Sequence, residues 1–340
     1  MRIYDTLSLI IITFAKMWTF RPIYKFPIWG AGRLPEFKGD RSNEMHCPSI
    51  GESWEISDVD GNVSVVALGP DKGLTLDDLM THYGADLVGK ENFRRFGNRF
   101  PLLIKLIDTS ANLSVQVHPD DAMAQSMGHP FGKNEMWVVL DAEPGATLSN
   151  GFIRVIDPKE LLTLVESGDI MNVLRNSPVQ AGSAFFIPAG RVHAIGKGIL
   201  TAEIQQTSDD TFRLYDYNRT DANGNKRQLH LDQAAKALNY ADTGGAPLLY
   251  NTKPESTMPV SVSPYFTVNM MRYTKPSVRD YSALDSFVAI MCLNGKATLS
   301  DDTASLTLTQ GNTVLLPATQ QSLSLRPEGD LEFKALEIYI

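Results

Sequence analysis

The sequence predicts a mainly β protein built from two antiparallel jelly-roll units with helical insertions. Short runs in which apolar and polar residues alternate recur along the chain, as in residues 113–118 and 201–208, and this period of two is typical of half-buried strands. Nineteen prolines and 25 glycines among 340 residues suit many short strands and turns better than long helices. A composition of 43% hydrophobic and 21% charged residues is ordinary for a globular protein, and the length allows one large or two medium domains.

The first elements are a strand region and a hairpin. Residues 22–33, PIYKFPIWGAGR, are aromatic and glycine-rich and indicate an edge strand followed by a loop. Residues 51–57 alternate around Trp54, and residues 63–68 follow a turn at Asp60–Gly61–Asn62. Two alternating runs on either side of such a turn predict a hairpin.

A helix and a buried strand come next. Thr75 is a suitable cap, and the apolar spacing after it predicts a helix to about residue 89, followed by a basic stretch over residues 93–100. Residues 101–108, PLLIKLID, predict a buried strand that contains Lys105. The Lys105 side chain either extends to solvent along its apolar stem or points into a polar site.

The middle of the chain alternates between helices and strands. Residues 157–168 predict a helix, with a proline in its first turn and a glycine after its end, and a second short helix is expected near residues 170–174. Strands are expected over residues 179–188, 201–208 and 212–217, and a short helix over residues 231–238.

The last part of the chain predicts a second β unit. Residues 241–259 resemble a linker, and from residue 260 onward strand and turn patterns repeat to the C-terminus. No histidine follows His230. We therefore expect this unit to hold no metal and to be structural rather than catalytic.

Four polar residues predict a metal site in the first unit. Gln116 and His118 are two apart in an alternating run, so their side chains share one face of a strand. Glu135 opens the next apolar run, and His193 ends a third. Two imidazoles, one carboxylate and one neutral oxygen form a site of borderline-soft type, which fits zinc best and leaves a position for water or substrate.

The sequence around these residues resembles that of a known family. The His–Glu–His pattern is common to the cupin superfamily, and the stretches SVQVHPDD, GKNEMW, GESWEIS and PAGRVHAIGKGILTAEIQQTSDDTFRLYDYNR are similar to those of type I mannose-6-phosphate isomerases in the short bacterial form. The resemblance runs from about residue 20 to the C-terminus. It implies two cupin-like jelly-roll domains with helical insertions. We expect an N-terminal extension over residues 1–16, a catalytic domain over 17–240, a linker over 241–259 and a metal-free domain over 260–340.

The resemblance also implies an activity and roles for residues. It implies a zinc-dependent aldose-ketose isomerase, with one zinc per chain, that interconverts mannose 6-phosphate and fructose 6-phosphate through a cis-enediol. Arg213 is the implied catalytic arginine. Lys133 is two residues before Glu135, so an extended segment would place it in the same pocket, where we expect it to hold a sugar oxygen or to help transfer a proton; a solvated loop lysine is the alternative. Lys133, Glu135 and a metal-bound water remain alternatives for the base. Longer family members have a histidine where this chain has Gly132, so a role for that histidine does not carry over.

Other interpretations of the same residues stay open. A two-His-one-carboxylate set can also hold Fe(II) in an oxygenase, and a cupin can bind a sugar without turnover. Arg213 could instead form a structural ion pair with a neighbouring aspartate. Weaker candidates are Lys90, Arg94 and Arg95 for the phosphate, His82 for the pocket lip, and His46, His129 and His230 as surface or structural histidines.

Charge and cysteine content bound the partners. The net charge is −8 with a pI near 5.3, so nucleic acid is not an expected partner because phosphate backbones require a basic surface. Residues 7–14, LSLIIITF, are too few to span a bilayer as a helix. Two cysteines without a metal motif fit a reducing compartment. We expect a cytoplasmic monomer or weak homodimer that acts on a small sugar phosphate and binds no membrane.

Overall fold

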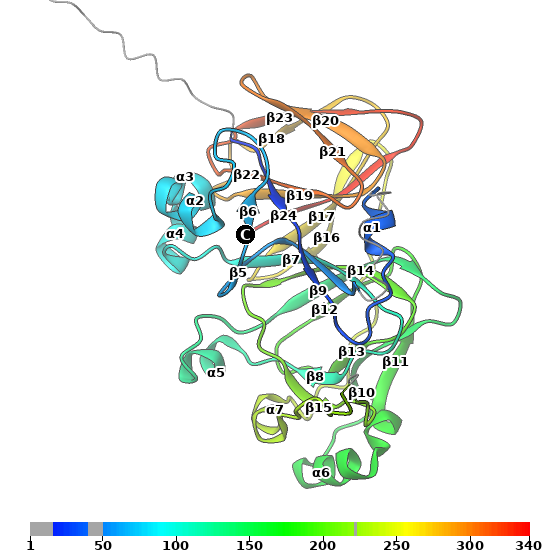
Figure 1. Ribbon diagram of the computed structural model, residues 1–340. Helices are drawn as coiled ribbons and strands as arrows, with labels where there is room; N and C mark the ends of the chain where they lie inside the picture. The colour runs from blue at the N-terminus through cyan, green and yellow to red at the C-terminus, as the bar shows by residue number, and fades with distance from the viewer. Residues whose placement is uncertain (1–15, 40–49, 221–222) are drawn as a thin grey trace, which may run out of the picture.

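The structure is a computed structural model that describes residues 16–39, 50–220 and 223–340, and it consists mainly of strands (Figure 1). The predicted mainly β fold with two jelly-roll units and helical insertions is confirmed. Four β layers lie on top of one another, and short helices cover their lower end and one side. Most of the predicted N-terminal extension, residues 1–15, lies outside the described residues, while Lys16 places its ammonium over the Tyr83 ring at 4.4 Å.

Two sheets form the first jelly-roll unit. The lower sheet has the order β11 (Leu174–Pro178), β10 (Thr147–Phe152), β13 (His193–Ile195), β8 (Val115–Val117) and β15 (Phe212–Tyr215). The sheet above it, called the six-stranded sheet below, has the order β12 (Ala184–Ile187), β9 (Glu135–Ala142), β14 (Ile199–Gln206), β7 (Leu102–Asp108), β3 (Glu52–Ile56) and β2 (Ile23–Lys25). All paired strands are antiparallel, and β2 occupies the edge as predicted.

Two further sheets form the second unit. The first has the order β16 (Ser256–Val262), β17 (Thr267–Tyr273), β24 (Phe333–Tyr339), β19 (Val288–Asn294), β22 (Thr313–Leu316), β1 (Trp18–Arg21) and β6 (Val65–Val66). The second has the order β18 (Ser277–Asp280), β23 (Ser322–Pro327), β20 (Lys296–Ser300) and β21 (Ser305–Thr309). Two strands from the start of the chain therefore complete a sheet made otherwise of C-terminal strands.

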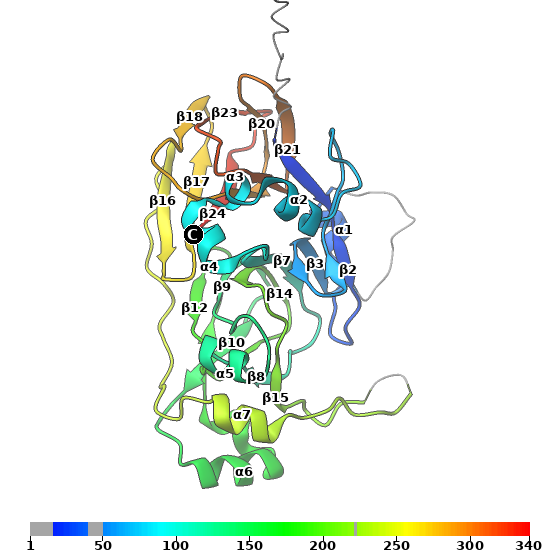
Figure 2. The same cartoon turned by 90° about the vertical axis from the view of Figure 1, so that its left-hand side faces the viewer.

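Helices are short and lie at the margins of the sheets. They are α1 (Leu34–Phe37), α2 (Leu76–Tyr83), α3 (Ala85–Val88), α4 (Lys90–Phe96), α5 (Asp121–Ser126), α6 (Pro158–Ser167), a 3-10 helix (Asp169–Val173) and α7 (Leu231–Ala237). Figure 2 shows α2, α3 and α4 beside the junction of the two units, and α6 and α7 below the lower sheet. None of the helices in the described part of the chain has the length and apolar character that a bilayer crossing requires.

The helix ends follow the sequence signals. Thr75 accepts a hydrogen bond from the Asp78 backbone N–H while the Asp78 carboxylate accepts from Thr75, which is a capping box. Asp157 caps α6, and Gly168 ends it at a φ of 81°. The helix expected to reach residue 89 instead ends before Gly84, where φ is 45°, and the chain restarts as α3 and then α4.

Other element boundaries differ from prediction. The hairpin expected between residues 51–57 and 63–68 is reduced to β4 (Asp58–Val59) paired with β5 (Asn62–Val63), because β3 pairs with β2 and β7 instead. The stretch predicted as linker ends early, since β16 begins at Ser256. The predicted domain boundaries stay predictions, and the pairing of Trp18 with Leu315 joins the start of the chain to the second unit.

Alternation along β9 separates the two main cores. Trp137 and Val139 point into the first jelly roll, where they pack with residues such as Phe185 and Ile187. Met136 and Val138 point the other way, into a core shared with the first sheet of the second unit. A strand places successive side chains on opposite faces, so Glu135 faces the interior of the first jelly roll.

Candidate metal centre and active site

Antiparallel pairing brings the predicted ligands together. His193 at the start of β13 is directly opposite Gln116 of β8, and Arg213 of β15 is opposite Gln116 on its other side. Directly opposite residues share a face of the sheet. His118 follows the end of β8, and Glu135 begins β9 in the six-stranded sheet. Three strand ends from one sheet and one from the other thus converge inside the first jelly roll.

The two histidines and the glutamate form one buried group. His118 Nε2 lies 3.4 Å from one Glu135 carboxylate oxygen, and His193 Nε2 lies 3.2 Å from the other. One ligand atom from each residue lies within 4.8 Å of the rest. The exposed fractions are 1% or less for all three residues. In the described part of the chain, these residues are the group that could hold a metal ion.

The hydrogen bonds around this group orient its lone pairs inward. His118 Nδ1 donates to the Asp210 carbonyl at 2.7 Å, and His193 Nδ1 donates to the Arg191 carbonyl at 2.9 Å. Both rings therefore present the Nε2 lone pair to Glu135. Both carboxylate oxygens of Glu135 are buried without a well-aligned hydrogen-bond donor, although the Lys133 ammonium lies 3.3 Å from one of them. Burying a carboxylate without such donors is costly, so this donor set fits a divalent cation.

Gln116 lies at the site with its amide nitrogen inward. Its Nε2 is 3.3 Å from His193 Nε2, whereas its Oε1 accepts from the Ser114 hydroxyl at 3.3 Å. Coordination through oxygen requires the amide to turn by about 180°, which exchanges two atoms of nearly equal size. The ligand role of Gln116 stays a prediction.

Burial and nearby charges inside the first jelly roll set the protonation states of the two histidines and the glutamate. Burial, together with the nearby Lys133 ammonium, lowers the pKa of His118 to about 3, so the ring is neutral. Burial opposes ionisation of Glu135, but Lys133 holds the pKa of this carboxyl well below its ordinary value. Burial also lowers the pKa of His193. Neutral imidazoles and an ionised carboxylate are the protonation states that metal ligation needs.

Lys133 lies inside the group rather than in a solvated loop. The residue is 4% exposed. Its Nζ lies 3.2 Å from His118 Nε2 and 3.3 Å from the Glu135 carboxylate. The prediction that Lys133 shares the pocket with Glu135 is therefore consistent with its position, while its chemical role stays a prediction.

A second buried polar cluster continues along the inner face of the six-stranded sheet. Lys105 Nζ lies 2.6 Å from the Glu203 carboxylate and 3.5 Å from that of Glu52. The Trp137 indole donates to Glu203 at 2.7 Å, and the Trp54 indole donates to Glu52 at 2.7 Å. Lys105 thus points into a polar site rather than to solvent. Burial disfavours the charged lysine, yet Glu203 and Glu52 raise its pKa overall.

Sequence reasoning missed Glu203 and Glu52. Glu203 stands directly between Trp137 and Lys105 in the strand register. A glutamate within a strand indicates a buried polar partner, but only the strand register identifies that partner as Lys105. Burial, followed by the Glu135 charge, raises the pKa of Glu203.

Arg213 belongs to a cluster of three arginines beside Gln116. Its Nε donates to the Ser114 hydroxyl at 3.2 Å, and a terminal nitrogen donates to the Gln228 carbonyl at 2.8 Å. Arg219 and Arg227 both bind the buried Asp216 carboxylate. Burial and the charges of Arg227 and Arg219 lower the pKa of Arg213. Three cations around one carboxylate leave an excess of positive charge at this edge of the site.

The weaker sequence candidates lie elsewhere. His82 is exposed and bonds to the Asp78 carbonyl of its own helix, His129 pairs with Asp210, and His230 accepts a hydrogen bond from the Arg213 backbone. His46 lies outside the described residues. The remaining candidates lie on α4, where Lys90 and Arg95 sit beside Arg94, which pairs with Glu91.

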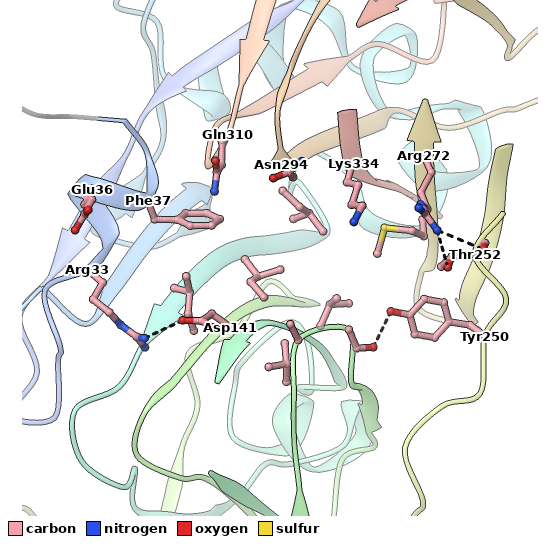
Figure 3. Close-up of a pocket in the computed structure, with 18 residues that line it drawn as sticks. Arg33, Glu36, Phe37, Asp141, Tyr250, Thr252, Arg272, Asn294, Gln310 and Lys334 are labelled. Atoms are coloured by element: carbon pink, nitrogen blue, oxygen red, sulfur yellow. Dashed lines mark hydrogen bonds and ion pairs between the residues drawn. The ribbon is translucent and has the colours of Figure 1, made fainter. Parts of the chain in front are cut away.

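A pocket of about 600 Å³ lies between the two units (Figure 3). Val138, Leu140 and Leu200 form one wall, and these side chains leave the six-stranded sheet on the face opposite Glu135. Arg33 and Asp141 stand at one end of the pocket, and Tyr250, Thr252 and Arg272 stand at the other. The sheet therefore separates this pocket from the candidate metal centre.

Comparisons with known proteins agree with this geometry. The family model of the phosphomannose isomerase type I catalytic domain matches residues 17–145, and that of the mannose-6-phosphate isomerase cupin domain matches residues 255–333. The mannose-6-phosphate isomerase of Streptococcus mutans is 36% identical over 314 residues, which covers 91% of this chain and 94% of the relative. The chain belongs to the type I phosphomannose isomerase family. A second family member, mannose-6-phosphate isomerase ManA of Bacillus subtilis, is 40% identical over 64% of this chain and 67% of its own length.

Solved structures of family members share the fold. The mannose 6-phosphate isomerase of Bacillus subtilis superposes with a TM-score of 0.82 at 30% identity, covering 95% of this chain and 99% of that protein. A putative mannosephosphate isomerase from Archaeoglobus fulgidus gives a TM-score of 0.75 at 21% identity over 95% of this chain and 97% of that one. The latter likeness concerns the fold alone.

Proposed function

We propose that this chain interconverts mannose 6-phosphate and fructose 6-phosphate. The observation that supports this proposal best is the buried group of His118, Glu135 and His193 inside the first jelly roll of a type I phosphomannose isomerase fold. Relatives named mannose-6-phosphate isomerases match over most of the chain. No feature of the described residues favours an oxygenase or a sugar-binding protein without turnover over this activity.

Zinc is the proposed metal, with one ion per chain. His118, Glu135 and His193 would hold it, and Gln116 would join them after its amide turns. Two neutral imidazoles and a carboxylate are a common ligand set for catalytic zinc. When bound, the ion would supply Lewis-acid polarisation of substrate oxygens, which favours loss of the proton next to the carbonyl.

Residues of this chain would carry the proton and the charge. An aldose becomes a ketose through a cis-enediol when a proton leaves C2 and another arrives at C1, and negative charge develops on the substrate oxygens in between. The Arg213 guanidinium, opposite Gln116, would stabilise that charge. Lys133 and Glu203 are buried on the inner face outside the ligand set, and both can exchange a proton. The raised pKa of Glu203 favours proton uptake.

The arginine cluster is the proposed phosphate site. Arg219 and Arg227 share a single carboxylate, Asp216, and lie beside Arg213. Guanidinium groups bind phosphate oxygens with paired donors. This location adjoins the ligand group, whereas Arg94 on α4 already pairs with Glu91. We therefore prefer Arg219 and Arg227 to the α4 residues as phosphate anchors.

Enzyme-coupled detection of fructose 6-phosphate formation from mannose 6-phosphate tests the activity directly. Metal analysis of protein purified without added metal tests the ion: about one zinc per chain supports the proposal, and iron in its place supports an oxygenase. His193→Ala removes a ligand and should lose both metal and turnover. A protein with zinc but without fructose 6-phosphate formation would contradict the proposed reaction.

The remaining expectations stay predictions. We propose a small sugar phosphate as substrate, a cytoplasmic location, no nucleic-acid or membrane partner, and a monomer or weak homodimer. The net charge of −8 supports the absence of nucleic-acid binding. Sedimentation of the purified protein measures the oligomeric state.

A further inference from the structure

The Nε2 atom of His118 has one lone pair and one partner that already uses it. Because Nδ1 donates its proton to the Asp210 carbonyl, the neutral ring has its only lone pair on Nε2. Lys133 Nζ lies 3.2 Å from this nitrogen and can only donate to it, since an ammonium has no acceptor. The lysine therefore occupies the lone pair that a metal ion would need.

The Lys133 ammonium also forms an ion pair with the Glu135 carboxylate. Lys133 Nζ lies 3.3 Å from the Glu135 oxygen that faces His118, and these three residues are 4% exposed or less. An ionised carboxylate at this depth requires a nearby positive charge. Lys133 supplies that charge from two residues away on the same strand end.

We propose that Lys133 is an exchangeable place-holder for the metal. Its ammonium keeps His118 and Glu135 in a ligand arrangement, and metal binding releases the ammonium because both cations require the same lone pair and the same carboxylate. This inference rests on the proposed metal site, and it makes Lys133 a competitor of the metal ion for His118 and Glu135.

Gln205 provides an acceptor for the released ammonium. Gln205 is directly opposite Glu135 in the strand register, fully buried, and its Oε1 has no hydrogen-bond donor. Its amide nitrogen donates to the Gln206 carbonyl at 3.1 Å and to the Ser208 carbonyl, so the amide is fixed with its oxygen free. Lys133 would thus move from His118 to the Gln205 amide oxygen only after metal has bound.

Lys133→Met tests the exchange, with Lys105→Met as the matched control. Both variants remove a buried ammonium near Glu135, but Lys105 contacts Glu203 and Glu52 instead of the ligands. Zinc affinity is measured by competition with a chelator, and the melting temperature is measured for the metal-free and zinc-loaded full chain. Neither readout depends on turnover.

The two variants are expected to differ in zinc affinity and in the melting temperature of the zinc-loaded protein. Lys133→Met should bind zinc about tenfold more tightly than the natural protein, which corresponds to roughly 1.4 kcal/mol. It should lower the melting temperature of the metal-free protein by about 3 °C or more and leave that of the zinc-loaded protein nearly unchanged, because only the former needs the place-holder. Lys105→Met should lower both melting temperatures and change zinc affinity by less than about threefold.

Two outcomes would overturn the place-holder. One is a zinc affinity of Lys133→Met within about threefold of that of Lys105→Met, which would reduce the effect to long-range charge. The other is an equal loss of melting temperature with and without zinc. If Lys133→Met does not fold, Lys133→Gln gives the same comparison with a neutral donor. Failure of the metal site itself is distinguishable, since the natural protein would then bind no zinc.

Discussion

Gly132 shows how a single backbone position shapes the active-site loop. A Cβ at this residue would lie 2.4 Å from the Asp120 carbonyl carbon and 2.5 Å from the Asp121 nitrogen. These neighbours are backbone atoms and cannot give way without moving the start of α5. The position that carries a histidine in longer family members therefore has no room for any side chain here, so the base must come from another residue.

We predict that Gly132→Ala destabilises the protein and lowers its activity. The added methyl forces the loop away from Asp121, whose carboxylate accepts from the Gly132 N–H at 2.8 Å, and overpacking of this kind costs about 1–3 kcal/mol. Because Lys133 is next in the chain, turnover should fall as well. Melting temperature and kcat measure both effects.

Gly128→Ala in the same loop is the control. Gly128 has a φ of 85°, but a Cβ added there would have no neighbour within 4 Å, so only backbone strain is added. Equal activity losses in the two variants would show that strain, rather than the contact with Asp120, determines the outcome.

Arg213 and Arg227 are predicted to affect different steps. Arg213→Ala should keep about one zinc and its melting temperature but lose on the order of 100- to 1,000-fold in kcat, because it removes charge stabilisation in the transition state. Arg227→Ala should mainly raise KM, as expected of a phosphate anchor. Steady-state kinetics with mannose 6-phosphate measures both. A steep rise in KM with unchanged kcat for Arg213→Ala would make that residue the phosphate anchor instead.

Much of the site was predictable from residue types and spacing, and some of it was not. Gln116 and His118 share a face because strands alternate. Glu135 was correctly expected to open a strand, whereas His193, which was expected to end one, begins β13. Glu203 was missed because its partner, Lys105, is 98 positions away, and only the strand register brings the two together. Lys133 can donate to His118 Nε2 only because His118 Nδ1 donates to the Asp210 carbonyl. No sequence pattern predicts that hydrogen bond.

At the scale of elements, capping residues in the sequence predicted the ends of several helices correctly. α6 lies between the predicted cap Asp157 and the predicted glycine Gly168, and α2 directly follows the predicted cap Thr75. The predicted hairpin was mostly wrong because β3 finds partners in β2 and β7, and pairing over long sequence distance overrides a nearby turn. β1 joined a distant sheet for the same reason.

The β4–β5 turn holds a buried carboxyl that should make stability depend on pH. Burial and the neighbouring Asp77 carboxyl raise the pKa of Asp58 from its ordinary 3.8 to about 8, against the Phe100 N–H and Arg99, which act in the opposite direction. The folded state then binds more protons than the unfolded state between these two pKa values. The free energy of unfolding contributed by Asp58 therefore falls as pH rises from about 4 to about 8.

We predict that Asp58→Asn flattens this dependence. Asparagine can accept from the Phe100 N–H and donate toward Asp77 at every pH, so the variant should equal the natural protein near pH 5 and exceed its melting temperature near pH 8. Asp60→Asn, which alters an exposed carboxyl of the same turn, should retain the natural pH dependence. Parallel curves for Asp58→Asn and the natural protein would contradict the assignment.

At the scale of the whole molecule, the two jelly rolls differ in what fills them. In the second unit, Glu337 is fully buried and accepts hydrogen bonds from Arg279, Tyr281 and Asn269. A carboxylate with this many donors has no free lone pair for a metal. We predict one zinc per chain and the same zinc content in Glu337→Gln, whose melting temperature should fall. A stoichiometry near two would contradict this difference between the units.

The two units share a core, so we predict that they unfold together and that neither is stable alone. Met136 and Val138 of the first unit pack against Met270 and Leu336 of the second in one buried cluster. β1 pairs with β22 through Trp18 and Leu315, so a chain that ends before residue 255 loses both this pairing and one wall of the core. Exposing that much apolar surface opposes folding. Such a truncated chain should be recovered aggregated or without a cooperative melting transition, whereas deletion of residues 1–15 should leave the melting temperature nearly unchanged. A soluble fragment of the first unit with zinc and a sharp transition would show that the shared core is dispensable.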